Sequence, residues 1–154
     1  MIVCLVAFII FYHLTGGGGS VIERYMDSCY TYAMKDLDPT RSVKKIPWGV
    51  KEGSTCNNLI EGVQKDYPDK HVYSSSTCPP DYYKIAPYID PSQDYFEFHF
   101  YRKDEDGWSH KMGSEGVPTR LDAGGNVITN PSIADRDYGN LNYTIECPTL
   151  CVKK

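Results

Sequence analysis

The sequence predicts an α+β domain in which one or two helices pack against a small antiparallel sheet, with an apolar anchor segment at the N-terminus. A helical pattern of apolar residues over 54–67 predicts a helix. Strict alternation of apolar and polar residues over 95–102 predicts a strand. With 154 residues, of which 41% are hydrophobic and 23% charged, the chain has the size and composition of one globular domain.

The N-terminal residues 1–15 are apolar or aromatic apart from His13 and Thr15. This run is shorter than the ~20 residues that a bilayer-spanning helix needs, and it lacks the basic start of a secretory signal. We expect an anchor that contacts membrane lipid; a signal-peptide core and an arm docked on another protein are the alternatives. Residues 16–20, GGGGS, predict a flexible tether, although the same run is also a common engineered linker. The globular domain is expected over 21–154.

Two helices are expected at the start of this domain. Asp27 or Ser28 can cap the first, which places Cys29 in its first turn and ends the helix before Pro39. The second helix, over 54–67, has a hydroxyl cap, an apolar face and a proline directly after it.

The rest of the domain is expected to be mainly strands and turns. Residues 69–91 are rich in proline and tyrosine and are expected to form an irregular connection. The strand over 95–102 is followed by a charged turn and a returning strand over 108–112. A further hairpin is expected over 121–129, and a short strand over 142–147. The phenylalanines of the strand over 95–102 share one face, which we expect to join the core.

The six cysteines suggest disulfides. Cys4 lies in the apolar segment and leaves five in the domain, so one free thiol and two disulfides is the simplest interpretation. It would suit a non-cytosolic or virion compartment. A zinc site is less favoured because no C-x-x-C pair is present, and no metal is expected. The sequence leaves the pairing open among Cys56, Cys78, Cys147 and Cys151.

Two histidines are expected to meet on the predicted hairpin. If the turn is the four residues 103–106, Arg102 pairs with Gly107, and His99 lies directly opposite His110 on the same face. A loop longer by one residue would move His110 to the other face.

A cysteine early in a helix is expected to have a lowered pKa, because the exposed amides and the dipole of the helix N-terminus favour the thiolate. A nearby histidine can take the thiol proton, and a second polar residue can fix the tautomer of that histidine. Cys29, His99 and His110 supply these three roles in chain order.

The segments SCYTYAM around Cys29 and HFYRKDEDGWSHKMG from His99 to Gly113 resemble the NlpC-type papain-like cysteine peptidases. These are α+β hydrolases, many of which cut peptidoglycan peptides. The runs HFYR…GWSHK, LDAGGNVI and ADRDYGNLNY also look like a group of uncharacterised bacterial and algal-virus domains. The resemblance covers 27–152. It implies that Cys29 is the nucleophile, His99 the general base and His110 the orienting residue, with no cofactor.

Two functions follow as hypotheses. The first is a membrane-anchored structural or interaction protein on a papain-like fold, such as a minor capsid protein between the internal membrane and the capsid shell of a virus. Its 13 tyrosines would suit contacts with protein neighbours in a larger assembly. The second is a membrane-tethered cysteine hydrolase, an amidase or peptidase, that acts on a peptide or cell-wall substrate. A net charge of −4 argues against a nucleic-acid partner.

Overall fold

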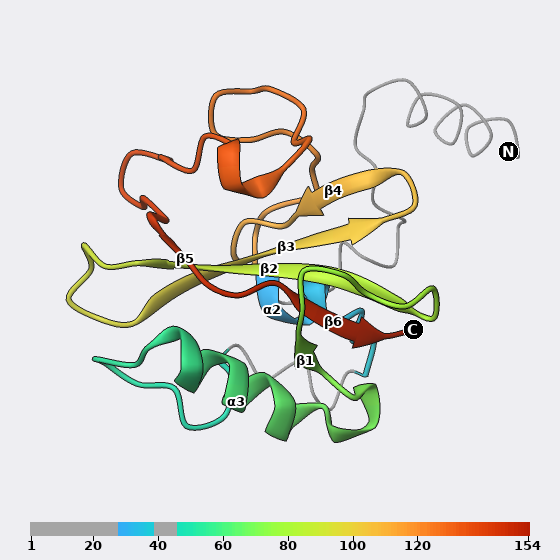
Figure 1. Cartoon of the computed structure of the whole chain (residues 1–154). Coiled ribbons are helices and arrows are strands. Elements are labelled where there is room, and N and C mark those ends of the chain that lie inside the picture. The colour runs from blue at the N-terminus through green and yellow to red at the C-terminus, as the bar shows by residue number, and fades with distance from the viewer. Residues whose placement is uncertain (1–27, 39–45) are drawn as a thin grey trace, which may run out of the picture.

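The computed structural model of the chain describes residues 28–38 and 46–154 (Figure 1). These residues form an α+β domain with a small antiparallel sheet and a few short helices, which confirms the predicted fold class. The anchor and tether predicted for 1–15 and 16–20 lie outside the described residues. Within the part that is described, none of the helices has the length and apolar character needed to cross a membrane.

The sheet is antiparallel, with the strand order β1-β6-β2-β3-β4, and β5 pairs with β2. Its strands are β1 (Tyr73–Ser74), β2 (Tyr82–Asp90), β3 (Glu97–Asp104), β4 (Gly107–His110), β5 (Ile145–Glu146) and β6 (Leu150–Lys153). The strand predicted over 95–102 is therefore β3, and the returning strand is β4. Of the predicted strand over 142–147, only β5 forms.

The long strand β2 lies within 69–91, where an irregular connection was expected, and that prediction is wrong. The strand includes Pro87, which has no N–H to donate to a neighbouring strand. The carbonyl of Pro87 accepts a hydrogen bond from the backbone N–H of Cys147 at 3.0 Å. Because the N and O atoms of a strand residue point the same way, the missing N–H faces the junction between β5 and β6. The proline thus interrupts no ladder with β3.

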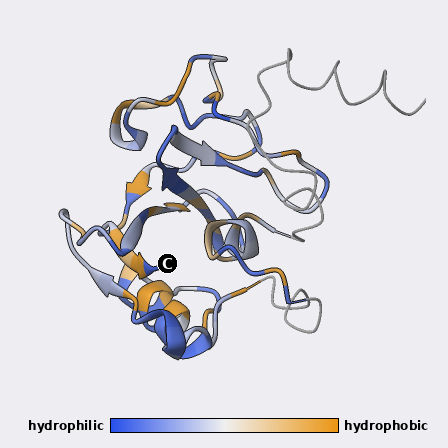
Figure 2. Ribbon diagram, turned by 90° about the vertical axis from the view of Figure 1, so that its right-hand side faces the viewer, coloured by the Kyte–Doolittle hydropathy of each residue, from blue (hydrophilic) through white to orange (hydrophobic). Residues whose placement is uncertain are grey.

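Two α-helices lie on one side of the sheet. The helix α2 (Cys29–Ala33) is capped by Ser28, whose side chain accepts a hydrogen bond from Thr31 N at 3.2 Å. The helix α3 (Cys56–Asp66) confirms the helix predicted over 54–67 and turns its apolar side towards the sheet (Figure 2). Two short 3₁₀ turns complete the described elements, η2 (Pro68–Lys70) and η3 (Pro131–Ile133).

Both faces of the sheet are buried. On one face, α2 and α3 cover Phe98 and Phe100, which confirms that this phenylalanine face joins the core. On the other face, the largely irregular segment 111–144 packs over the sheet (Figure 1). His99 and Tyr101 point into this second core and are 1% and 0% exposed. Alternation of apolar and polar residues predicts one buried and one exposed face, but here the face that carries His99 and Tyr101 is buried too.

Two disulfides join the C-terminal segment to earlier parts of the chain. Cys56 pairs with Cys147, which links the start of α3 to the segment before β6. Cys78 pairs with Cys151, which links the loop before β2 to β6 itself. Cys29 is the free thiol among the cysteines that the structure describes. The predicted count of two disulfides and one free thiol in this region is confirmed.

Candidate functional site

The Cys29 side chain lies at the start of α2, against the edge of β3. Its Sγ donates a hydrogen bond to Phe98 O at 3.9 Å. The strand β4 ends at His110, which pairs with Tyr101, so the preceding residues of β3 have no partner in β4. The thiol therefore occupies the place beside β3 that a longer β4 would fill.

The hairpin that carries the two histidines has a shorter turn than predicted. Asp104 pairs with Gly107 across two turn residues, so the expected pairing of His99 with His110 is wrong by two positions. His110 instead lies opposite Tyr101. Because the shift is even, both histidines remain on one face of the sheet. They are diagonal neighbours.

The two imidazoles nevertheless meet directly. His99 Nε2 and His110 Nδ1 are 2.9 Å apart, and His110 Nε2 is 2.9 Å from Leu121 O. A carbonyl only accepts, so His110 Nε2 carries a proton and, in the neutral ring, His110 Nδ1 accepts from His99 Nε2. The hydrogen bonds thereby leave His99 Nδ1 as the nitrogen with a free lone pair.

Burial keeps both rings neutral. It lowers the pKa of His99 well below its ordinary value, and the neighbouring His110 lowers it further. Burial also lowers the pKa of His110, although the Leu121 carbonyl and the Asp122 charge oppose the shift. A neutral His99 has the protonation state that a general base requires.

Two tyrosines hold the His99 ring in place. The Tyr143 ring packs against it at a centroid distance of 5.1 Å, and the Tyr101 ring meets it edge-on at 5.0 Å. The Tyr143 hydroxyl donates to Glu97 Oε1 at 2.9 Å, and Tyr143 is itself 1% exposed. The imidazole is therefore positioned by packing as well as by hydrogen bonds. The sequence pattern did not single out Tyr143, because it lies far along the chain in an irregular segment.

The pKa of the Cys29 thiol differs from the expected value. Cys29 is 7% exposed, and burial raises its pKa to about 12, so the expected lowering by the helix N-terminus is wrong. The helix has only five residues, and the loss of hydration outweighs its dipole. Cys29 is therefore a neutral thiol near pH 7. Among the described residues, its hydrogen bond goes to Phe98 O, and none joins it to a ring nitrogen of His99.

Lys111 is a further charged residue close to the Cys29 thiol. It is fully buried, and its Nζ donates to Gly113 O at 2.9 Å and to Ser114 O at 2.8 Å. Its positive charge lowers the pKa of Cys29 and so opposes the effect of burial. A lysine that directly follows a strand is usually exposed, and no local pattern marks this one as buried.

The four cysteines considered for zinc are oxidised in the two disulfides, so that alternative is wrong. In the described part of the chain, no group of three or more metal-binding side chains comes together. Comparison with protein-family models, with curated proteins and with solved structures finds no match to this chain. What the site can do therefore rests on its own geometry: a thiol beside β3 and an oriented, neutral imidazole pair.

The histidine pair predicts how stability depends on pH. Folding lowers both pKa values, so below the ordinary histidine value of 6.5 the unfolded chain binds more protons than the folded chain. The free energy of unfolding should be highest above about pH 7 and should fall on acidification, by up to ~1.4 kcal/mol per pH unit for each histidine. Urea unfolding at pH 7.5 and 5.5 measures this loss.

His99→Gln should make the loss between these two pH values smaller. The control His71→Gln, at an exposed position, should leave it unchanged. An equal loss in the wild type and the His99 variant would show that other groups, such as carboxylates, cause the pH dependence.

Proposed function

We propose that the domain is a papain-like cysteine hydrolase, an amidase or peptidase, with Cys29 as nucleophile, His99 as general base and His110 as orienting residue. The hydrogen-bond chain from Leu121 O through His110 to His99 carries this proposal. It leaves the acceptor nitrogen His99 Nδ1 free. His99 directly follows Phe98, whose carbonyl accepts the hydrogen bond from the thiol. An imidazole that a third group orients, with a free acceptor nitrogen, is one part of what thiol activation by a general base needs; the thiol must also come within hydrogen-bond reach of it.

The chemistry would begin with transfer of the thiol proton to His99 Nδ1 while Sγ attacks the carbonyl carbon of an amide. The imidazolium that forms is stabilised because His99 Nε2–H already donates to His110. His99 then returns the proton to the leaving amine, the C–N bond breaks, and a thioester remains on Cys29. Water, losing a proton to His99, hydrolyses the thioester and releases the acid and the thiol.

The resting thiol is protonated and covered, so reaction would require the Cys29 side chain to turn from Phe98 O towards His99. In this mechanism, deprotonation accompanies attack on the substrate and does not precede it. We therefore expect slow alkylation of Cys29 by iodoacetamide at pH 7, which mass spectrometry of the labelled peptide would measure. Alkylation faster than that of a free cysteine would contradict the raised pKa of this thiol.

Activity can be measured with peptide amides and soluble peptidoglycan fragments, with mass spectrometry of the products as the readout. Cys29→Ala should abolish cleavage, and His99→Gln should lower it by about 10²–10⁴-fold, which is typical for loss of a general base. His71→Gln, at an exposed position, is the matched control and should retain full activity. If Cys29→Ala cleaves as fast as the wild type, Cys29 is not the nucleophile.

A second candidate is a membrane-anchored structural protein on the same fold, such as a minor capsid protein beneath a capsid shell. The covered thiol favours this role, because a neutral cysteine at 7% exposure does not require a catalytic function. Residues 1–15 would hold the lipid and the tyrosine-rich domain would contact neighbouring proteins. In this case no substrate is cleaved, Cys29→Ala assembles normally, and deletion of 1–15 abolishes binding to lipid vesicles.

A further inference from the structure

Glu97 is a carboxylate at the candidate site that the proposed mechanism does not use. It lies two residues before His99 on β3, so the two side chains are on the same face of the sheet. The Cys29 thiol contacts the carbonyl of Phe98, the residue between them. Burial, and after it the charge of Glu97, raise the pKa of Cys29. The carboxylate is therefore within electrostatic reach of the sulfur.

The surroundings of Glu97 contain a second carboxylate. Glu97 Oε1 accepts a hydrogen bond from the Tyr143 hydroxyl at 2.9 Å, and the direct cross-strand partner of Glu97 is Asp90. Like charges in this position destabilise a sheet. Burial raises the pKa of Glu97, and the Asp90 charge raises it further. Within the described part of the chain, no lysine or arginine pairs with either carboxylate.

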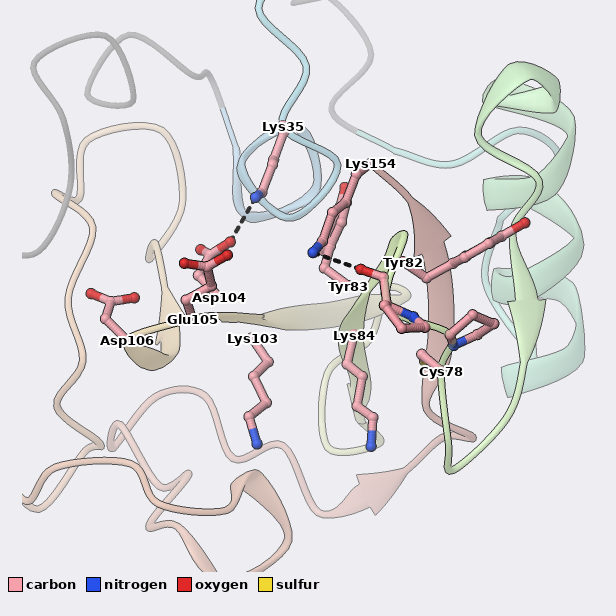
Figure 3. A pocket seen from close by; sticks show the side chains of 12 residues that line it. Lys35, Cys78, Tyr82, Tyr83, Lys84, Lys103, Asp104, Glu105, Asp106 and Lys154 are labelled. Atoms are coloured by element: carbon pink, nitrogen blue, oxygen red, sulfur yellow. Dashed lines mark hydrogen bonds and ion pairs between the residues drawn. The ribbon is translucent and has the colours of Figure 1, made fainter.

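The opposite end of β3 shows the usual way in which this chain neutralises an acidic side chain. A cavity of about 700 Å³ lies there, and Figure 3 shows the Lys35 ammonium directed at the Asp104 carboxylate that lines it. Asp104 is paired with Lys35 and with Arg102, each at 2.6 Å. Of the two acidic residues of β3, Asp104 is thus neutralised by described residues of the chain, and Glu97 beside the thiol is not.

We propose that Glu97 binds a primary ammonium group of the substrate, so that the hydrolase acts on peptides with an amine close to the scissile amide. This inference rests on the hydrolase function proposed above. Because Tyr143 donates to Oε1, Oε2 is left for a further donor. A single oxygen suits the compact ammonium of a lysine side chain or of a peptide N-terminus better than the two-pronged guanidinium of arginine.

Binding of an ammonium would also assist the chemistry. It offsets the Glu97 charge that, after burial, raises the pKa of Cys29. Transfer of the thiol proton to His99 then becomes easier, because the thiolate no longer forms beside an uncompensated negative charge. A peptide whose amines are acetylated leaves that charge in place. The preference for an amine should therefore appear both in the affinity for the peptide and in kcat/KM.

The test uses the full chain with Cys29→Ala, which forms no thioester, so that binding is measured apart from cleavage. The ligands are the tripeptide Ala-Lys-Ala amide and its forms acetylated at Nα, at Nε or at both amines. Isothermal titration calorimetry gives each Kd. We expect the doubly acetylated peptide to bind at least about tenfold more weakly than the free peptide, as for the loss of one charged hydrogen bond. The singly acetylated forms identify which amine Glu97 binds.

Three further variants, each combined with Cys29→Ala, separate recognition of the ammonium from a structural role. Glu97→Gln should abolish the difference between the peptides, because glutamine keeps an acceptor for Tyr143 but has no charge. Glu61→Gln, at an exposed position on α3, is the matched control and should keep the difference. Tyr143→Phe should keep it too. If Glu97 served only to hold Tyr143, Tyr143→Phe and Glu97→Gln would act alike.

The proposal is overturned if the free and the doubly acetylated peptides bind with the same Kd, if neither binds at millimolar concentration, or if the preference survives Glu97→Gln. Equal kcat/KM of the wild type for these two peptides would also contradict it, while the hydrolase function would stand. An amine preference that Glu97→Gln abolishes, in a chain whose wild type cleaves neither peptide, would instead contradict the hydrolase function and leave the ammonium site in place.

Discussion

Replacement of Cys56 and Cys147 together by serine is expected to lower the free energy of unfolding by about 4.6 kcal/mol, from the loop-closure entropy of a crosslink that spans 91 residues. The disulfide restricts the unfolded chain far more than the folded one, in which α3 and the segment before β6 already lie together. Such a loss is a large part of the stability of an ordinary small domain. Urea unfolding followed by circular dichroism measures it.

The second disulfide provides the comparison. Cys78 and Cys151 are 73 residues apart, so their joint replacement should cost about 4.4 kcal/mol by the same relation. The two loops overlap in the chain, so removal of both disulfides should cost less than the sum of the separate losses. A loss below about 1 kcal/mol in either double variant would mean that strain or residual structure cancels the entropic effect.

Phe100→Ala is expected to lower the free energy of unfolding by about 3–5 kcal/mol, as is typical for a large aromatic residue removed from a core. Phe100 is fully buried, stacks on Tyr30 at 5.4 Å and meets Phe98 edge-on at 5.6 Å. It thus joins α2 to β3 directly behind the candidate site. The cavity left by the ring should also loosen the contact that holds Cys29 against β3.

Phe96→Ala is the matched control for this prediction. Phe96 shares the face of Phe98 but is only partly buried at the edge of the core. Its loss should cost clearly less than that of Phe100, as measured by urea unfolding under the same conditions. Equal losses would mean that burial does not set the cost of removing a phenylalanine from this face.

The elements predicted correctly are those with strong local signals. The helix α3 carries an apolar face and a terminating proline, and β3 alternates strictly between its two faces. The strand β2 was missed because Pro87 and the neighbouring tyrosines are typical of loops. Only pairing with strands on both sides shows that the proline N–H is not needed there.

In the candidate site, too, the features with local signals could be predicted and those that depend on tertiary pairing could not. The order of Cys29, His99 and His110 and their residue types could be found in the sequence, and so could the shared face of the two histidines. The register of the hairpin could not be predicted from the sequence. The turn is two residues shorter than expected because Asp104 and Gly107 pair, and no local signal indicates that pair. Tyr143 and Leu121 reach the site from a largely irregular segment, and no periodic pattern predicts such contacts.

Sequence patterns alone determined which segments form α3 and β3, the presence of two disulfides and a free thiol, and the face that His99 and His110 share. These depend on local periodicity and on the number of cysteines. The tertiary structure decided the disulfide pairing, the burial of both faces of the sheet and the raised pKa of Cys29. These depend on which distant segments exclude water from a residue, and no short stretch of sequence contains that information.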